Sequence, residues 1–178
     1  MFFLHCKDPN EPDLYGVKVS RTAYKFHLNR HTGEKFSLES NRGKYTFLFF
    51  GFSHCTSTCP PMLRVMQSIA QKITKKSLSL VYITIDPKRD KQEHLAVLQK
   101  YLGSKSVVLT GSEKNIKSIA KEYGVFFQEE LYQTDDNYQL HHSGNLYLID
   151  PQLKIRLLYP SGYYNITKIY QDFISLRH

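Results

Sequence analysis

The sequence contains little cysteine and no long hydrophobic run. Of its 178 residues only three are cysteines, and two of these stand close together. This count excludes the disulfide framework of small secreted proteins, and a close pair in a domain of this size is typical of redox or metal chemistry. No window approaches the ~18 consecutive apolar residues that a membrane-spanning helix needs. We therefore expect a soluble chain, with any anchor or export signal removed or located upstream of its first residue.

The sequence also lacks a long basic run, although it is basic overall. It has 24 Lys and Arg against 16 Asp and Glu, a formal net charge of +8. Scattered positive charge is typical of a solvated surface, with an acidic protein partner or an anionic membrane surface as the alternatives. Since no basic-plus-aromatic motif accompanies the charge, nucleic acid is not expected as a partner.

No repeat, low-complexity segment or Pro/Gly/Ser linker divides the chain. With 41% hydrophobic and 22% charged residues, 178 residues are enough for one full-sized core. We predict a flexible lead-in over residues 1–16, a candidate remnant of an anchor or export segment, and a single domain over residues 17–178. Cys6 is interpreted as an unpaired residue near a frayed terminus, with a lipid-attachment remnant as the alternative.

Strands and helices alternate through the middle of the chain. Two apolar runs, "KYTFLFFGF" and "LSLVYITID", predict strands buried on both faces, and "SVVLTG" predicts a third. This alternation indicates an α/β domain whose central mixed β-sheet is flanked by helices. The other expected elements are an N-terminal β-hairpin in residues 25–40, helices over 60–76 and 91–102, a helix capped by Ser112, an extended segment over 125–140 with a turn at 135–137, a hairpin with its turn near Pro151, and a last helix from about Asn165.

The stretch "GFSHCTSTCPP" carries the close cysteine pair, Cys55 and Cys59, where the first central strand gives way to its helix. Pro60 suits the first position of a helix, so the helix should begin just after Cys59. The helix dipole then favours thiolate at both sulfurs. Ligands bind at this carboxyl end of the strands in open α/β sheets.

The pair by itself leaves its chemistry open. A thioredoxin-type redox pair usually has two intervening residues, and this pair has three. Two thiolates with one imidazole suit Cu(I), whereas zinc would require a fourth ligand.

A metal site therefore needs a histidine that reaches the two sulfurs. His54 adjoins Cys55, but its side chain would point away from an extended segment, and His94 is expected at the surface. His141 and His142 directly precede an apolar strand, a position that is more often structural or exposed. The residues alone do not select one of them.

Three blocks, "GFSHCTSTCP", "VYITIDPKRD" and "HHSGNLYLIDPQLKIRLLYP", resemble in order and separation the signatures of the Sco/SenC family of copper chaperones. The resemblance runs from about Val17 to the C-terminal helix and implies a thioredoxin-like fold. It also implies Cys55, Cys59 and His142, the histidine followed by serine, as ligands for Cu(I) and Cu(II). Many members have an acidic residue before that histidine; His141 stands there instead and is the alternative ligand.

The block "DPKRD" offers further candidates. A strand end, a turn and a helix cap already account for Asp86 and for Asp90, which is paired with Glu93 in the expected cap. Asp86 is kept as a candidate for supporting the metal ligands from behind.

The resemblance implies a metallochaperone rather than a turnover enzyme. It would assist assembly of the dinuclear copper centre of cytochrome c oxidase, with a copper donor protein and a copper-accepting oxidase subunit as partners. Tethering to the inner membrane through a segment absent from this chain would make it face the periplasm, or alternatively the mitochondrial intermembrane space. The alternative function is a thiol–disulfide oxidoreductase acting on cysteines of a partner protein.

Overall fold

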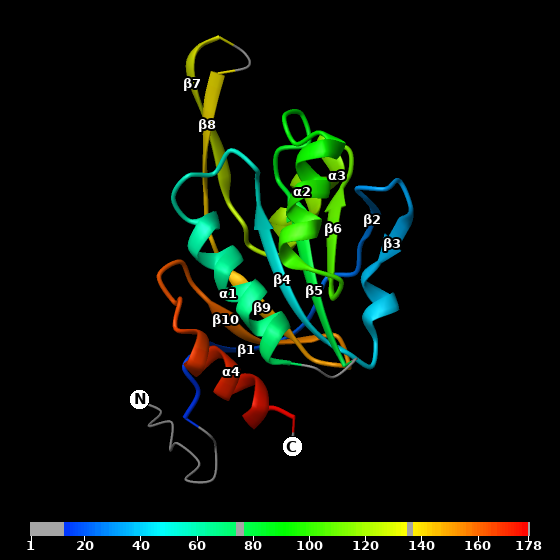
Figure 1. The fold of residues 1–178 in the computed structure, drawn as a ribbon, viewed down its shortest axis with the longest axis vertical. Coiled ribbons are helices and arrows are strands. Elements are labelled where there is room, and N and C mark those ends of the chain that lie inside the picture. Colours follow the sequence, from blue (N-terminus) through cyan, green and yellow to red (C-terminus); the bar gives the residue numbers. More distant parts are fainter. Residues whose placement is uncertain (1–12, 74–76, 135–136, 178) are drawn as a thin grey trace, which may run out of the picture.

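The computed structural model describes residues 13–73, 77–134 and 137–177 (Figure 1). Eight strands form one mixed sheet in the order β1-β10-β9-β4-β5-β6-β2-β3. The central strands β4, β5 and β6 are parallel, and the strands on either side of them pair antiparallel. The sheet strands are β1 (Val17–Thr22), β2 (His27–Arg30), β3 (Lys35–Ser37), β4 (Tyr45–Gly51), β5 (Leu78–Thr84), β6 (Ser106–Thr110), β9 (Leu146–Ile149) and β10 (Lys154–Tyr159).

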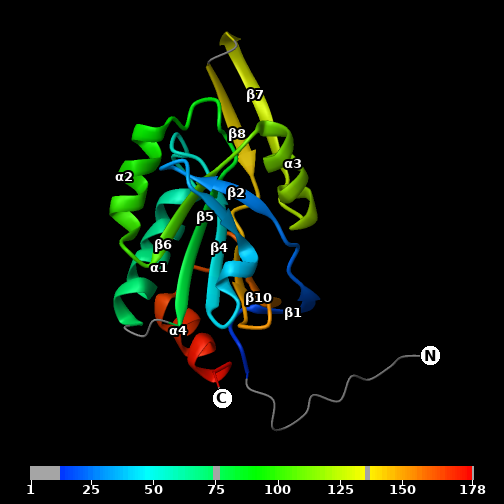
Figure 2. The same cartoon turned by 90° about the vertical axis from the view of Figure 1, so that its right-hand side faces the viewer.

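Helices cover both faces of this sheet (Figure 2). Helices α1, α2 and α4 lie on one face and α3 lies on the other, so the central strands are buried on both sides. The helices are η1 (Leu38–Asn41), α1 (Cys59–Lys72), α2 (Gln92–Leu102), α3 (Glu113–Glu122) and α4 (Ile166–Ser175). The predicted central mixed sheet with flanking helices is confirmed. None of the helices in the described part of the chain has the length and apolar character to cross a bilayer.

A separate two-stranded hairpin, β7 (Phe127–Thr134) and β8 (Asn137–His142), projects past the end of the sheet (Figure 1). It was predicted as an extended segment with a turn at 135–137, and residues 135–136 lie outside the described residues. Its last residue, His142, lies close to the carboxyl end of β4.

The predicted N-terminal hairpin is present, because Leu28 of β2 pairs with Phe36 of β3. The C-terminal hairpin of β9 and β10 and the helix cap of Ser112 are also confirmed. Strand β1 was not predicted, since its side chains are almost all exposed and its apolar alternation is limited to Val17 and Val19.

Two expected boundaries differ from the structure. Helix α1 ends at Lys72, and the rest of its expected span includes residues 74–76, outside the described residues. The predicted cap of α2 by Asp90 is wrong: Lys91 is the N-cap residue and makes no capping hydrogen bond with its side chain. The Asp90 carboxylate instead accepts hydrogen bonds from the backbone N–H and hydroxyl of Ser53, because it is buried beneath the loop that precedes the cysteine pair.

The predicted lead-in, residues 1–16, lies largely outside the described residues, and so does Cys6. Its last two residues are held in place, since the backbone N–H groups of Tyr15 and Gly16 each donate to Asp172 of α4 at 2.9 Å.

Candidate metal centre

The two cysteines stand on a short loop that leads from β4 into α1. Helix α1 begins at Cys59, one residue before the predicted start at Pro60, and has prolines in its first turn. The backbone N–H of Cys55 donates to Phe52 at 3.2 Å, and the N–H of Cys59 donates to the Cys55 sulfur at 3.2 Å. This loop therefore turns both sulfurs toward the same point, and both cysteines are free thiols.

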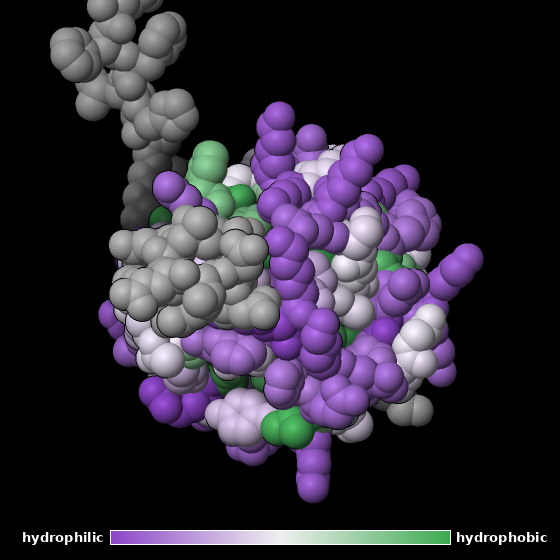
Figure 3. Space-filling model, turned by 90° about the horizontal axis from the view of Figure 1, so that it is seen from above, coloured by the Kyte–Doolittle hydropathy of each residue, from purple (hydrophilic) through white to green (hydrophobic). Residues whose placement is uncertain are grey.

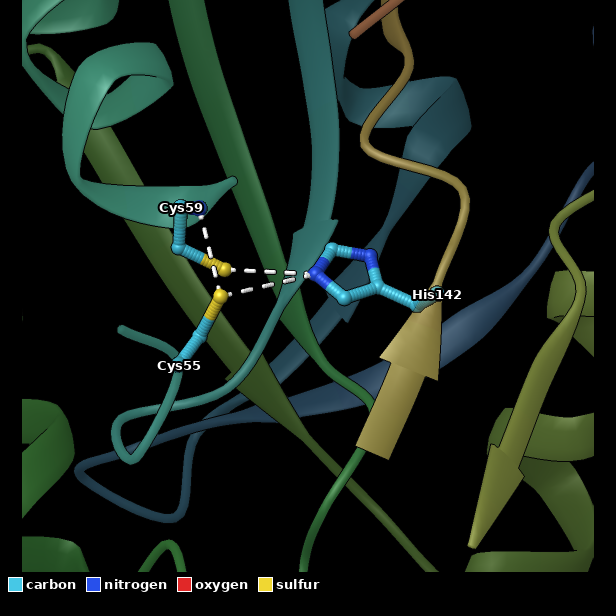
Figure 4. A group of neighbouring side chains, drawn as sticks. All are labelled: Cys55, Cys59 and His142. Carbon is cyan, nitrogen blue, oxygen red and sulfur yellow. Dashed lines mark hydrogen bonds between the residues drawn. The ribbon is translucent and has the colours of Figure 1, made fainter. Parts of the chain in front are cut away.

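His142 approaches the pair from the other side (Figure 4). Its Nε2 lies 3.4 Å from the Cys59 sulfur and 3.8 Å from the Cys55 sulfur. The two sulfurs and one imidazole nitrogen all lie within 4.8 Å of one another. No other group of three candidate ligand side chains converges in this way among the described residues.

Aromatic side chains hold the imidazole ring in place. The edges of Phe49 and Phe52 meet it at centroid distances of 6.2 and 5.7 Å, both near T-shaped. Its other nitrogen, Nδ1, is buried and has no hydrogen-bond partner in the described part of the chain. A metal-binding histidine usually donates from that nitrogen to a carboxylate or carbonyl. Here aromatic packing holds the ring on the Nδ1 side, while Nε2 lies 3.1 Å from the Thr58 hydroxyl.

The two thiols differ in acidity. The pKa of Cys55 is lowered to about 3, chiefly by the hydrogen bond from the Cys59 thiol, with help from His142 and Thr58 and against the effect of burial. The pKa of Cys59 is raised, because its proton is held in that hydrogen bond and because the side chain is buried. The expectation that both sulfurs favour thiolate is therefore wrong for Cys59. The two sulfurs share one proton, and that proton stays on Cys59 although the residue lies at the start of a helix.

Two glycines that the sequence analysis did not single out make room for this arrangement. A Cβ on Gly51 would lie 3.0 Å from the Cys59 sulfur and 2.8 Å from the Phe49 ring. A Cβ on Gly144 would lie 3.2 Å from Cβ of Thr58, where the segment after His142 passes the cysteine loop. The sequence signal was a glycine at the end of an apolar strand and another two residues after a candidate ligand.

The other histidine candidates lie outside the group. His141 is exposed on the opposite face of β8, since successive strand residues alternate sides. His54 forms a hydrogen bond with Ser53 and does not join the converging ligands, and His94 is exposed at the start of α2. The expectations for His54 and His94 therefore agree with the structure.

Asp86 touches none of the three converging side chains. Its carboxylate accepts from Arg89 Nε and from the Tyr138 hydroxyl, both at 2.6 Å. Arg89 in turn donates to the Tyr138 carbonyl at 2.7 Å and stacks over the Tyr138 ring at 3.6 Å. Because Tyr138 and His142 lie on β8, this buried cluster ties that strand to the loop after β5. Asp86 acts on the strand and not directly on a metal ligand.

A cavity of about 350 Å³ opens beside the cysteines, between α1 and α2. Its walls are mostly apolar, and the two cysteines, Ser53, Arg64 and His94 contribute to the lining. The end of the molecule at which β4 and β5 terminate is mainly hydrophilic where it is not grey (Figure 3). The cavity is thus an apolar recess close to the two sulfurs.

Two sulfur ligands and one imidazole form a soft donor set. Such a set matches Cu(I) in number and type, whereas a structural zinc site would need a fourth protein ligand. The half-buried Cys55 keeps the group accessible from outside, while Cys59 and the phenylalanine rings close it from behind.

Comparison with known proteins identifies the same family as the sequence blocks. The SCO1/SenC family model matches residues 17–176. A SCO2-like protein of Rickettsia conorii is 37% identical over 154 residues, covering 83% of this chain and 75% of that protein. The human mitochondrial SCO1 homolog is 33% identical over 130 residues, which is 71% of this chain but 43% of the human protein.

A solved structure of Arabidopsis thaliana ScoI with copper bound has the same fold. It superposes with a TM-score of 0.78 at 28% identity, covering 88% of this chain and 99% of that one. The fold of this protein is therefore that of the thioredoxin-like Sco structures. From the match over nearly its whole length, the chain belongs to the SCO1/SenC family.

Proposed function

We propose that this chain is a copper metallochaperone that holds its cargo through Cys55, Cys59 and His142. The observation that carries the proposal is the position of His142 Nε2, which lies 3.4 and 3.8 Å from the two sulfurs although the chain separates it from them by more than 80 residues. A redox pair does not require an imidazole beside its sulfurs, whereas a three-coordinate Cu(I) site built on two thiolates needs a third donor, which this imidazole supplies. The copper-bound Arabidopsis relative supports copper as the metal.

Binding follows from the protonation of the pair. Cys55, with its pKa near 3, is a thiolate at neutral pH and offers the first ligand. Cys59 must release the proton that it shares with Cys55 before both sulfurs can bind. The half-buried position of Cys55 would then let thiolates of an acceptor protein replace the ligands one at a time.

The biological setting forms part of the proposal. We propose delivery to the subunit of cytochrome c oxidase that contains the dinuclear copper centre, and receipt of copper from a donor protein, with family membership as support. The mitochondrial human relative and the bacterial Rickettsia relative are compatible with either of two settings. We propose an inner-membrane-tethered protein facing the periplasm, with the mitochondrial intermembrane space as the alternative.

The direct test is an anaerobic titration of the reduced protein with Cu(I) in the presence of a competing chelator. One equivalent should bind. Cys55→Ala and Cys59→Ala should each weaken binding at least 100-fold and His142→Ala about tenfold, because each removes one ligand. His141→Ala is the matched control and should leave the affinity unchanged. Binding that is unaffected by Cys55→Ala or His142→Ala would contradict the proposal.

The low pKa of Cys55 is also what a thiol–disulfide oxidoreductase would use. The two functions separate in a thiol-exchange assay with a cysteine-containing partner peptide and a copper chelator. A metallochaperone should show little catalysed exchange under these conditions, whereas sustained turnover would favour the oxidoreductase.

A further inference from the structure

Two further histidines lie beside the cysteine pair without joining its ligand group. The rings of His54 and His94 are 5.7 Å apart between centroids and nearly perpendicular at 86°. His54 lies on the cysteine loop and His94 in the first turn of α2, and both are exposed. His94 also lines the cavity that the two cysteines share.

The hydrogen bond of His94 determines which of its ring nitrogens is protonated. Its Nδ1 lies 3.1 Å from the backbone carbonyl of Arg89. A carbonyl oxygen can only accept, so Nδ1 carries the proton and donates it. The lone pair of the neutral ring is therefore on Nε2.

A longer relay gives His54 the same tautomer. Its Nδ1 lies 3.0 Å from the Ser53 hydroxyl, whose only proton is already donated to the buried Asp90 carboxylate. The hydroxyl oxygen must then accept from His54, which places the proton on Nδ1 and the lone pair on Nε2. A backing hydrogen bond of this kind to a carboxylate, direct or relayed, is the usual support of a metal-binding histidine.

We propose that His54 and His94 form a second metal site, a two-imidazole site for Cu(II) at the mouth of the cavity. Two imidazoles bound to one ion at about 2.0–2.1 Å have ring centroids roughly 4.5–6 Å apart, a range that includes the observed spacing. Imidazole pairs favour Cu(II) over the other common divalent ions, while Cu(I) prefers the thiolates. The net charge of +8 repels cations in general, so binding here must come from coordination and not from a long-range field.

The position of this pair would place a Cu(II) ion next to the sulfur site, and the role of such an ion rests on the function proposed above. Ser53 and His94 line the same cavity as Cys55 and Cys59, so an ion held at the two imidazoles is adjacent to the sulfur site. The buried Asp90 carboxylate, 4.0 Å from His54 Nδ1, supplies negative charge to a cation at this position.

The test isolates the two imidazoles by removing the sulfurs. Full-length protein carrying Cys55→Ser and Cys59→Ser is titrated with Cu(II) alone, followed by calorimetry and electron paramagnetic resonance. Adding His54→Gln and His94→Gln should abolish one binding step, or weaken it at least tenfold, together with its two-nitrogen hyperfine pattern. The matched control, His27→Gln with His31→Gln, removes two imidazoles near the other edge of the sheet and should retain that step. Superimposable titrations of the two quadruple variants would overturn the proposal.

Two further measurements separate this site from its neighbours. On the same background, Ser53→Ala should weaken Cu(II) binding about tenfold and Ser53→Thr should restore it, because the relay to Asp90 needs a hydroxyl. An effect of Ser53→Ala that persists without His54 would contradict the relay.

With both cysteines present, His54→Gln/His94→Gln should leave Cu(I) affinity unchanged. If Cu(I) binding survived Cys55→Ser/Cys59→Ser, the proposed sulfur site would fail, while the Cu(II) comparison would still decide the imidazole site.

Discussion

At the residue scale, two chemically identical side chains have opposite acidities because they share one proton. Cys59 is buried and donates to Cys55, and Cys55 also contacts Thr58 and His142. Since the Cys59 thiol is the largest cause of the low pKa of Cys55, the acidity belongs to the pair and not to the loop alone.

The reactivity of Cys55 should follow from this. Because its folded pKa of about 3 lies well below the ordinary value near 8.5, its thiolate is fully formed throughout pH 5–9. The rate of alkylation by iodoacetamide should be nearly constant over that range, whereas an ordinary thiol gains about tenfold per pH unit below its pKa. Cys59→Ala removes the main donor, so the rate should then rise with pH through an inflection well above 3. The same flat profile in Cys59→Ala would mean that the helix terminus, and not Cys59, sets the acidity.

Gly51 provides the space behind the Cys59 sulfur. Gly51→Ala places a Cβ 2.8–3.0 Å from the Phe49 ring, the Tyr82 hydroxyl and that sulfur, closer than real Cβ contacts. Overpacking of this kind should lower the free energy of unfolding by about 1–3 kcal/mol, measured by urea denaturation. Because the sulfur must move, Cu(I) affinity should also fall severalfold. Full copper affinity in a destabilised protein would show that the strain is relieved through Phe49 instead.

At the element scale, the hairpin of β7 and β8 presents His142 although it is not part of the main sheet. The cluster of Asp86, Arg89 and Tyr138 attaches β8 to the loop after β5. The position of the imidazole therefore depends on an ion pair in the loop after β5 that holds Tyr138, four residues before His142 on β8.

Loosening this attachment should lower the Cu(I) affinity only through its effect on the position of His142. Arg89→Met removes the bond to the Tyr138 carbonyl and the stacking on its ring, and Cu(I) affinity should fall about tenfold, close to the effect of His142→Ala. Tyr138→Phe, which loses one hydrogen bond to a carboxylate worth about 1.5–3 kcal/mol, should have a smaller effect. Arg30→Met, which removes an exposed ion pair with Glu34, is the control and should leave the Cu(I) affinity unchanged.

A double-mutant comparison tests whether Arg89 affects Cu(I) binding through His142. In the His142→Ala background, Arg89→Met should have no further effect on Cu(I) affinity, because the imidazole that it positions is gone. An equal loss in both backgrounds would mean that Arg89 acts on the cysteine loop.

At the scale of the whole molecule, the two ends of the domain are joined far from the metal centre. Asp172 of α4 is buried and accepts from the backbone of Tyr15 and Gly16 and from the Tyr159 hydroxyl of β10. One carboxylate thus connects the segment before β1, strand β10 and the last helix.

Asp172→Ala should therefore destabilise the domain without changing its chemistry. Losing these bonds leaves buried donors unpaired and should lower the free energy of unfolding by about 2–4 kcal/mol, measured by urea denaturation. Residues 13–16 should become the first site of limited proteolysis. Cu(I) affinity should be unchanged, and a large loss of it would reveal coupling between the two ends of the sheet.

The sequence by itself determined the elements that have one apolar face or are buried on both faces. Strands β4 and β5 were predicted because strands covered on both faces are apolar throughout, and α1 because Pro60 suits the start of a helix. It could not reveal β1, whose apolar alternation is limited to Val17 and Val19, nor the burial of Asp90 under the cysteine loop.

The sequence likewise indicated the three ligand residues, but it did not show how they meet in space. Cys55 and Cys59 are four residues apart, so their local chain brings the sulfurs together. His142 was selected by family resemblance, since no local pattern distinguishes it from His141. Only the tertiary structure decided which imidazole meets the sulfurs, because strand alternation and the anchoring of β8 by Arg89 direct position 142 inward and position 141 outward.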